Sequence, residues 1–307
     1  MKKILLIMAA VSIAAAADAR ILRVSNVSGS SAPYTSIEAA HDAASSGDTI
    51  MVDASGTLYF EGQITLSKSV VLLGPGYWLV ENGIIEEGIS TARLSAIHFK
   101  GEGSVIKGFT TKNLYIEAPK VIVSRCVVDG SIGFSKGADN CIVHQNFIKE
   151  GIASRGGSSV RTNYHSITNN IFTYTGTGAS YLGGFSKCYI AYNTFRTSQV
   201  YIGGTEDTTF EYNIAQAYKD TGSGNSFSNN YDTNIVNVQA TNDFIDKDYY
   251  NIEIPSDVRS TYGAFAGDSP YVFSGVPAGP VIQDLVVPTT VEMGSKLNVT
   301  IKVGVQQ

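Results

Sequence analysis

The sequence predicts an all-β protein, a right-handed parallel β-helix in which short strands wind into a solenoid. Three observations lead to this prediction. A strand–Asn–strand motif returns along the middle of the chain at the spacing of a solenoid coil. Apolar residues occupy fixed positions around each of these asparagines. The 31 glycines and 17 tyrosines, with many serines, threonines and asparagines, suit short strands joined by polar turns.

The repeating motif consists of a short strand, an asparagine and a second short strand. Its copies are IVHQNFI (142–148), SITNNIF (166–172), YIAYNTF (189–195), TFEYNIA (209–215) and SFSNNYD (226–232). The recurrent position is held by Asn146, Asn170, Asn193, Asn213 and Asn230, with Cys126 one coil earlier. A tight bend favours the left-handed backbone conformation, which Asn tolerates, and stacked amides can hydrogen-bond from coil to coil. We therefore predict an internal asparagine ladder with a structural role.

Two columns of apolar residues flank the ladder, as strand alternation requires. Three residues before the ladder position stand Val123, Val143, Ile167, Ile190, Phe210 and Phe227. Two residues after it stand Val128, Ile148, Phe172, Phe195 and Ala215. Between the columns the residue types vary and are mostly polar. We expect both columns to face the interior of the solenoid.

The first 19 residues have the pattern of an export signal. Lys2 and Lys3 precede an apolar run that ends at Ala17, and Ala17-Asp18-Ala19 fits a small-x-small cleavage site. The run is shorter than the roughly 20 residues that span a bilayer, so we favour a signal peptide over a membrane anchor and expect no transmembrane segment. The mature chain is expected to begin at Arg20. It would be secreted or held at the cell surface, with the periplasm as the alternative destination.

The mature chain divides into a β-helix over residues 20–247 and a capping segment over 248–307. Near the start, Ile37, Ala40 and Ala44 recur at helical spacing and Ser36 is a candidate N-cap, so a short helix is expected to cap the solenoid. The tail is rich in Gly and Pro. We expect two strands in it, near 281–287 and 296–303, to form a β cap over the far end. The alternative is a small separate module.

The ladder and the entry segment together resemble the pectate-lyase-like right-handed β-helix superfamily. The entry segment is YTSIEAAHDAASSGDTIMVDASGTLY (34–59) followed by ITLSKSVVLLGPG (64–76). The tail is similar to those that follow β-helices in secreted bacterial proteins of unknown activity. The resemblance implies the fold, and in pectinolytic members the substrate groove lies on the strand before the strand–Asn–strand unit. The vWiDH-type motif of pectate lyases and the aspartate trio with Gly-His-Gly of polygalacturonases are absent.

Three tyrosines on that preceding strand are candidate carbohydrate-binding residues. Tyr181, Tyr201 and Tyr218 each lie twelve residues before a ladder asparagine. If Leu182 and Ile202 face inward, the tyrosines form an outward stack whose ring faces suit sugar rings. The alternative is an exposed tyrosine ladder that only stabilises strand pairing.

A second outward row, three residues after the ladder position, supplies further candidates. Asp129 and Lys149 lie on adjacent coils within ion-pair reach, and both, with Arg196, would border a groove. A lyase would also need several carboxylates to hold Ca²⁺. The available acids are Glu206, Asp207 and Glu211, and because surface acids usually bind no metal we predict no metal and no cofactor.

We therefore predict an exported protein that binds polysaccharide or a cell-surface glycan at a Tyr-lined face. No catalytic residue is assigned, because no pair of carboxylates can be placed about 5–10 Å apart on one face. One alternative is a polysaccharide lyase or glycoside hydrolase acting on acidic glycans, and another is a structural adhesin or spike. A net charge of −5 and a pI near 5.4 argue against a nucleic-acid partner.

The three cysteines are predicted to be unpaired. Cys141 and Cys188 are two coils apart, about 10 Å, which exceeds disulfide reach. Cys126 occupies the ladder position itself.

Overall fold

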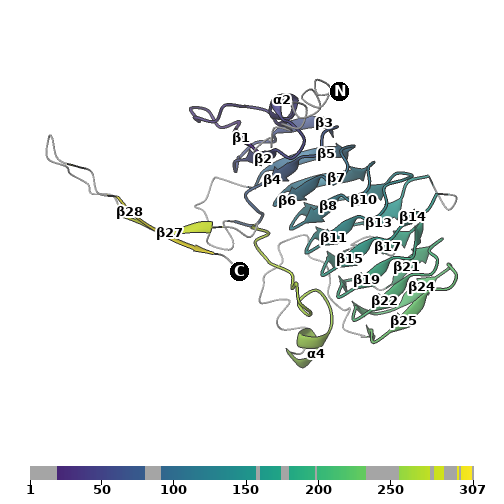
Figure 1. Ribbon diagram of the computed structural model, residues 1–307. Helices are drawn as coiled ribbons and strands as arrows, with labels where there is room; N and C mark the ends of the chain where they lie inside the picture. Colours follow the sequence, from purple (N-terminus) through teal and green to yellow (C-terminus); the bar gives the residue numbers. More distant parts are fainter. Residues whose placement is uncertain are drawn as a thin grey trace, which may run out of the picture.

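The computed structural model describes residues 19–79, 91–156, 160–173, 180–197, 199–232, 256–276, 280–286, 296 and 299–305. Over these residues the chain winds into a parallel β-helix (Figure 1). The predicted export signal lies outside the described residues except for Ala19. The same is true of much of the tail.

Ten parallel strands form the first sheet, and successive coils contribute them in order. They are β1 (Ile21–Val24), β2 (Thr49–Val52), β4 (Val71–Leu73), β6 (Val105–Lys107), β8 (Ile122–Ser124), β11 (Ile142–His144), β15 (Ser166–Thr168), β19 (Tyr189–Ala191), β22 (Thr209–Glu211) and β25 (Ser226–Ser228). The predicted apolar column runs in register through this sheet and is fully buried from Val123 to Phe210. Its last member, Phe227, is 41% exposed.

The second sheet has fourteen strands and starts with three long ones. These are β3 (Phe60–Leu66), β5 (Arg93–Phe99) and β7 (Thr110–Ile116). In later coils two short strands replace the long one. The first of each pair follows the ladder position: β9 (Val127–Val128), β12 (Phe147–Ile148), β16 (Ile171–Phe172), β20 (Thr194–Phe195), β23 (Ile214–Ala215) and β26 (Tyr231–Asp232). The second members are β10 (Ser131–Phe134), β13 (Gly151–Ser154), β17 (Ser180–Gly183), β21 (Val200–Gly203) and β24 (Tyr218–Asp220).

The asparagine ladder is confirmed. Asn170 Nδ2 donates to Asn193 Oδ1 at 3.0 Å, and the same oxygen accepts the backbone N–H of Asn170 at 3.0 Å. The pattern repeats from Asn146 to Asn230, and the backbone N–H of Cys126 donates to Asn146 Oδ1 at 3.0 Å. These amides satisfy buried backbone groups that the bend leaves without strand partners.

The left-handed residue of each bend is not the ladder asparagine but the residue before it, which corrects our expectation. This position is held by Arg125, Gln145, Asn169, Tyr192, Tyr212 and Asn229, with φ between 51° and 57°. The ladder asparagine keeps a negative φ, which directs its side chain into the core. The preceding side chain points out of the solenoid.

A second ladder, of mixed chemistry, occupies the turn before the first sheet. Its members follow a left-handed residue in the same way, and they are Cys141, His165, Cys188, Thr208 and Asn225. Each side chain after that of Cys141 accepts the backbone N–H of the member one coil earlier at 3.1–3.2 Å, through Nδ1, Sγ, Oγ1 and Oδ1 in turn. Beside it, β14 (Thr162–Asn163) and β18 (Phe185–Ser186) form a short parallel pair. The three cysteines are free and buried, as predicted.

The N-terminal helix is also confirmed. α2 (Ile37–Ala43) buries Ile37 and Ala40 against the first coil, and Ser36 Oγ accepts the N–H of Ala39 at 3.2 Å. It contacts β1, β2 and β3, so it covers the start of the core.

Part of the tail runs back along the side of the solenoid (Figure 1). We call residues 256–276 the strap; it includes α4 (Ser256–Thr261). It lies over the ladder turns and is held by their left-handed residues. Asn169 Nδ2 donates to two strap carbonyls at 2.8 and 3.1 Å, Gln145 Nε2 to two more at 2.7 and 3.2 Å, and Arg125 Nη1 to Val276 O at 2.6 Å. The strap thereby buries Val127, Phe147 and Ile171 in a second apolar cluster.

The predicted β element in the tail is a hairpin of β27 (Pro280–Val286) and β28 (Thr300–Val305). The two strands form a sheet of their own and extend none of the solenoid sheets. We expected them over the last coil, but in Figure 1 they project beside the early coils. The expectation failed because the strap carries the chain back toward its start before the hairpin begins.

Candidate functional site

A groove of about 570 Å³ lies on the outer face of the second sheet, across β7, β10, β13 and β17. Tyr115 and Arg155 line one part of it, and Tyr181 lines another. Glu150 also borders the groove, and the remaining lining residues are Ser131, Ile132, Gly133, Gly151, Ile152, Ala153 and Ser154. The strands that form it precede the strand–Asn–strand units. The groove therefore runs across coils, parallel to the solenoid axis.

Small residues form the floor of the groove, and the arginine depends on them. The outward positions of β10 and β13 are Ser131, Gly133, Gly151 and Ala153, which pair in register. A Cβ added at Gly133 would lie 2.8 Å from Arg155 Cδ, so the arginine side chain lies flat across this glycine. Its guanidinium then reaches the ring of Tyr115 at 4.3 Å.

A cluster of ionisable groups stands beside Tyr115. Glu117 contacts His98 through Oε1 and Nδ1, Lys100 Nζ lies 3.7 Å from its Oε2, and Arg155 Nη1 lies 3.9 Å from its Oε1. The His98 ring packs on Tyr115 with a centroid distance of 4.5 Å. Glu117 therefore compensates the charge of Arg155 at the groove, while the Tyr115 ring, packed against His98, holds the guanidinium in place.

Two of the predicted tyrosines form the expected outward pair. Tyr181 and Tyr201 are in register, and their rings stack with centroids 5.6 Å apart and planes 20° apart. A Cβ at Gly203 would lie 2.8 Å from Tyr181 Oη and 2.9 Å from Tyr201 Cε1, so both rings lean over this glycine. Tyr181 is 41% exposed. The ring of Tyr201 has a charged neighbour, because Lys219 Nζ lies 5.7 Å from its centroid. The free ring face in the groove is that of Tyr181.

Tyr218 does not belong to this row, contrary to prediction. β24 pairs with β21 so that Tyr218 lies opposite the buried Val200, and Lys219 lies opposite Tyr201. Tyr218 packs against the core, with its ring centroid 5.2 Å from that of Phe227. The equal spacing to a ladder asparagine was misleading because the segment that leads to Asn230 is one residue shorter: Lys219, the partner of Tyr201, lies eleven residues before its asparagine instead of twelve.

None of the three residues of the second predicted row lines the groove. Lys149 Nζ lies 2.7 Å from Asp129 Oδ1, which is the ion pair expected from the sequence. Arg196 follows Phe195 two coils further on and is partly exposed. Two groove-lining residues are close to this row in the chain: Ser131 lies two residues after Asp129, and Glu150 follows Lys149 directly.

The acidic residues considered for Ca²⁺ have other partners or lie apart. Glu206 Oε1 is 2.6 Å from Arg161 Nη2, and Glu211 lies near Tyr189, where burial and this carboxylate raise the pKa of the tyrosine hydroxyl. Within the described ranges, no three His, Cys, Asp or Glu side chains gather as metal ligands would. The helices of the described chain are likewise too short and too polar for a bilayer span.

Sequence analysis missed Tyr115, Glu117 and Arg155. Tyr115 and Glu117 lie in and directly after β7, whose coil has Cys126 in place of the ladder asparagine, so the strand–Asn–strand motif does not mark it. The alternation in AIHFK (96–100) and NLYIEA (113–118) was the available signal. Aligning the buried residues of these strands places His98 beside Tyr115 and Lys100 beside Glu117, as the register shows for the first pair.

Comparison of the chain with known protein families, curated proteins and solved structures finds no match.

Proposed function

We propose that this protein binds a polysaccharide chain in the groove across β7, β10, β13 and β17. The observation that carries the proposal is the pairing of two aromatic rings with a floor of small residues. Tyr115 with its stacked Arg155 and the exposed face of Tyr181 line the groove, with Gly133, Gly151 and Ala153 between them. Aromatic faces pack on the apolar faces of sugar rings, and a narrow floor lets a flat ligand approach the backbone.

The dimensions suit an oligosaccharide. Tyr115 and Tyr181 lie three coil steps apart, which is about 14 Å at the strand spacing of a β-sheet. A ligand that touches both rings must therefore extend over several sugar units. Burial and the neighbouring Tyr201 raise the pKa of the Tyr181 hydroxyl, so it remains a neutral hydrogen-bond donor.

The charges favour an uncharged glycan over an acidic one. Arg155 faces the carboxylate of Glu117, and Lys149 is paired with Asp129. Glu150 is exposed on the groove wall, where it would repel a uronate and accept hydrogen bonds from sugar hydroxyls. Turnover by a hydrolase would need a second carboxylate across the scissile bond, and of the described groove-lining residues Glu150 alone carries one. Binding without turnover is therefore the function proposed.

A titration of neutral and acidic polysaccharides tests this proposal. We expect neutral chains to bind more tightly, and Tyr181→Ala to weaken binding about 5- to 30-fold, the scale of a stacking contact of about 1–2 kcal/mol. Tyr164→Ala is the matched control, because Tyr164 is 55% exposed on a turn outside the groove. Equal losses in both variants would contradict the assignment of the groove.

The same samples separate the alternatives. Release of unsaturated uronates or new reducing ends would show a lyase or hydrolase. If no polysaccharide binds at millimolar concentration, the binding proposal fails and a structural adhesin or spike becomes the better account.

We further propose that the protein acts outside the cytoplasm. The support is the pattern of the first 19 residues, a charged start, an apolar run and Ala17-Asp18-Ala19. Fractionation of cells that produce the full chain tests this directly. Retention of unprocessed protein in the cytoplasm would contradict it.

A further inference from the structure

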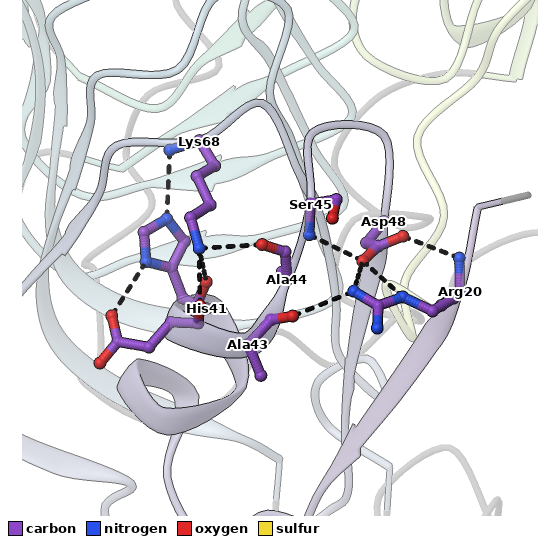
Figure 2. A network of polar contacts seen from close by, with 8 residues as sticks. Arg20, His41, Ala43, Ala44, Ser45, Asp48 and Lys68 are labelled. Atoms are coloured by element: carbon purple, nitrogen blue, oxygen red, sulfur yellow. Dashed lines mark hydrogen bonds and ion pairs between the residues drawn. The ribbon is translucent and has the colours of Figure 1, made fainter. Parts of the chain in front are cut away.

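Asp48 is a buried carboxylate that faces the start of the solenoid. It lies in the turn between α2 and β2, and its side chain is 3% exposed. Figure 2 shows the donors that surround it. Oδ2 accepts the N–H of Ser45 at 2.8 Å and the Arg20 guanidinium at 2.8 and 3.2 Å. Oδ1 accepts the backbone nitrogen of Arg20 at 2.8 Å.

The contact to the backbone nitrogen distinguishes this site from an ordinary Arg–Asp pair. Arg23 and Asp53, at the other end of this strand pair, form a two-oxygen fork in which Nη2 donates to Oδ2 at 2.8 Å and Nε to Oδ1 at 3.0 Å. Asp53 is more exposed, at 23%, and its carboxylate receives only side-chain donors in this pair. Asp48 thus offers one oxygen to the side chain of Arg20 and the other to its main chain.

We propose that cleavage between Ala19 and Arg20 creates an α-ammonium group that docks on Asp48. This inference rests on the proposed export of the protein. An endopeptidase that accepts small residues would hydrolyse the exposed Ala19–Arg20 bond. The water oxygen becomes part of the new Ala19 carboxylate, and the Arg20 nitrogen takes the hydrogens to become an ammonium. Its nitrogen already lies 2.8 Å from Oδ1, so docking needs no rearrangement.

Docking would strengthen the first coil. An ammonium donor replaces an uncharged N–H donor, which makes the contact an ion pair, at a carboxylate that stays ionised because backbone hydrogen bonds from Ser45 and Arg20 lower the pKa of Asp48 to about 2. β1 begins one residue later, at Ile21, and pairs with β2 at the edge of the first sheet. The new terminus would therefore be fixed at the point where the solenoid begins.

The test compares two purified chains, one with Arg20 as its first residue and one that begins at Asp18. At pH 6.5 we expect the chain that begins at Arg20 to melt about 2–4 °C higher. Docking favours the charged amine, so its pKa rises above the usual 7.7–8.0. The advantage is then complete below pH 7.7 and disappears as the pH rises through the folded-state pKa.

Asp48→Asn in both chains should abolish the difference, and Asp53→Asn, the matched control, should leave it intact. Equal melting temperatures at pH 6.5, or a difference that survives Asp48→Asn, would overturn the proposal. So would an exported protein whose first residue, by N-terminal sequencing, is not Arg20.

Discussion

At the scale of single residues, the two turn columns solve one problem with different side chains. Each coil leaves a buried backbone N–H at the bend, and a side chain of the next coil accepts it. The asparagine column uses one amide throughout, whereas the second column uses imidazole, thiol, hydroxyl and amide groups. The first could be predicted because its residue type repeats. The second could not, because the shared property is an acceptor atom and not a residue.

The thiols should be chemically silent in the folded protein. Burial raises the pKa of Cys126 and Cys141 to about 12 and that of Cys188 to about 11. Because the thiolate is the reactive form, we expect no reaction with a thiol reagent in the native state and three equivalents in denaturant without reductant. Fewer than three in denaturant would mean that a disulfide forms.

His165 should make the fold sensitive to acid. Burial lowers its pKa to about 4, and its Nδ1 accepts the N–H of Cys141, which a protonated ring cannot do. Between about pH 6.5 and 4 the unfolded chain therefore binds a proton that the folded chain does not, so stability falls as the pH falls. The slope from this group approaches about 1.4 kcal/mol per pH unit.

His165→Asn should reduce the pH dependence of the free energy of unfolding by the contribution of one bound proton, about 1.4 kcal/mol per pH unit. Asn225 shows that this column accepts asparagine, although the substitution also removes the ring stacked 4.3 Å from Phe134 and so lowers stability at every pH. Urea unfolding between pH 4 and 7 gives the slope. An unchanged slope in the variant would contradict the role assigned to His165.

At the scale of elements, the strap is the part that the sequence did not disclose. Between the two inward columns we expected mostly polar residues, yet four of the six ladder residues are followed by an aliphatic or phenylalanine side chain, Val127, Phe147, Ile171 and Ile214. A strand that is apolar on both faces is covered on both. This was the signal for a covering segment. Which segment covers these strands is decided by contacts between residues more than 90 apart in the chain, and a local sequence pattern cannot reveal such contacts.

Asn169→Gly should loosen the strap and leave the bend intact. Glycine adopts the left-handed conformation readily, so the loss is that of the two bonds to Ala264 and Ala266. We expect destabilisation of about 1–3 kcal/mol and faster proteolysis within 256–276. Asn229→Gly, at the equivalent exposed bend of the last described coil, should have little effect. Similar proteolysis of both variants would contradict this role of the strap.

At the scale of the whole molecule, the repeat predicted the coils, their register and the inward columns, because these depend on alternation and spacing. The groove depends instead on outward positions, whose residue types do not repeat from coil to coil. Its aromatic and charged residues lie in or directly beside β7, β13 and β17, and the path of Arg155 depends on a glycine one coil away. Counting twelve residues back from a ladder asparagine predicted the outward position of Tyr181 correctly and that of Tyr218 wrongly. Only the coil of Tyr181 keeps the register on which the count depends.

The most direct measurement of the central claim is a crystal structure of the protein with a neutral oligosaccharide that it binds. We predict sugar rings in the groove over Ala153, with one ring against Tyr181 and another beside Tyr115 and Arg155. An oligosaccharide bound elsewhere on the solenoid, with this groove occupied only by water, would contradict the account.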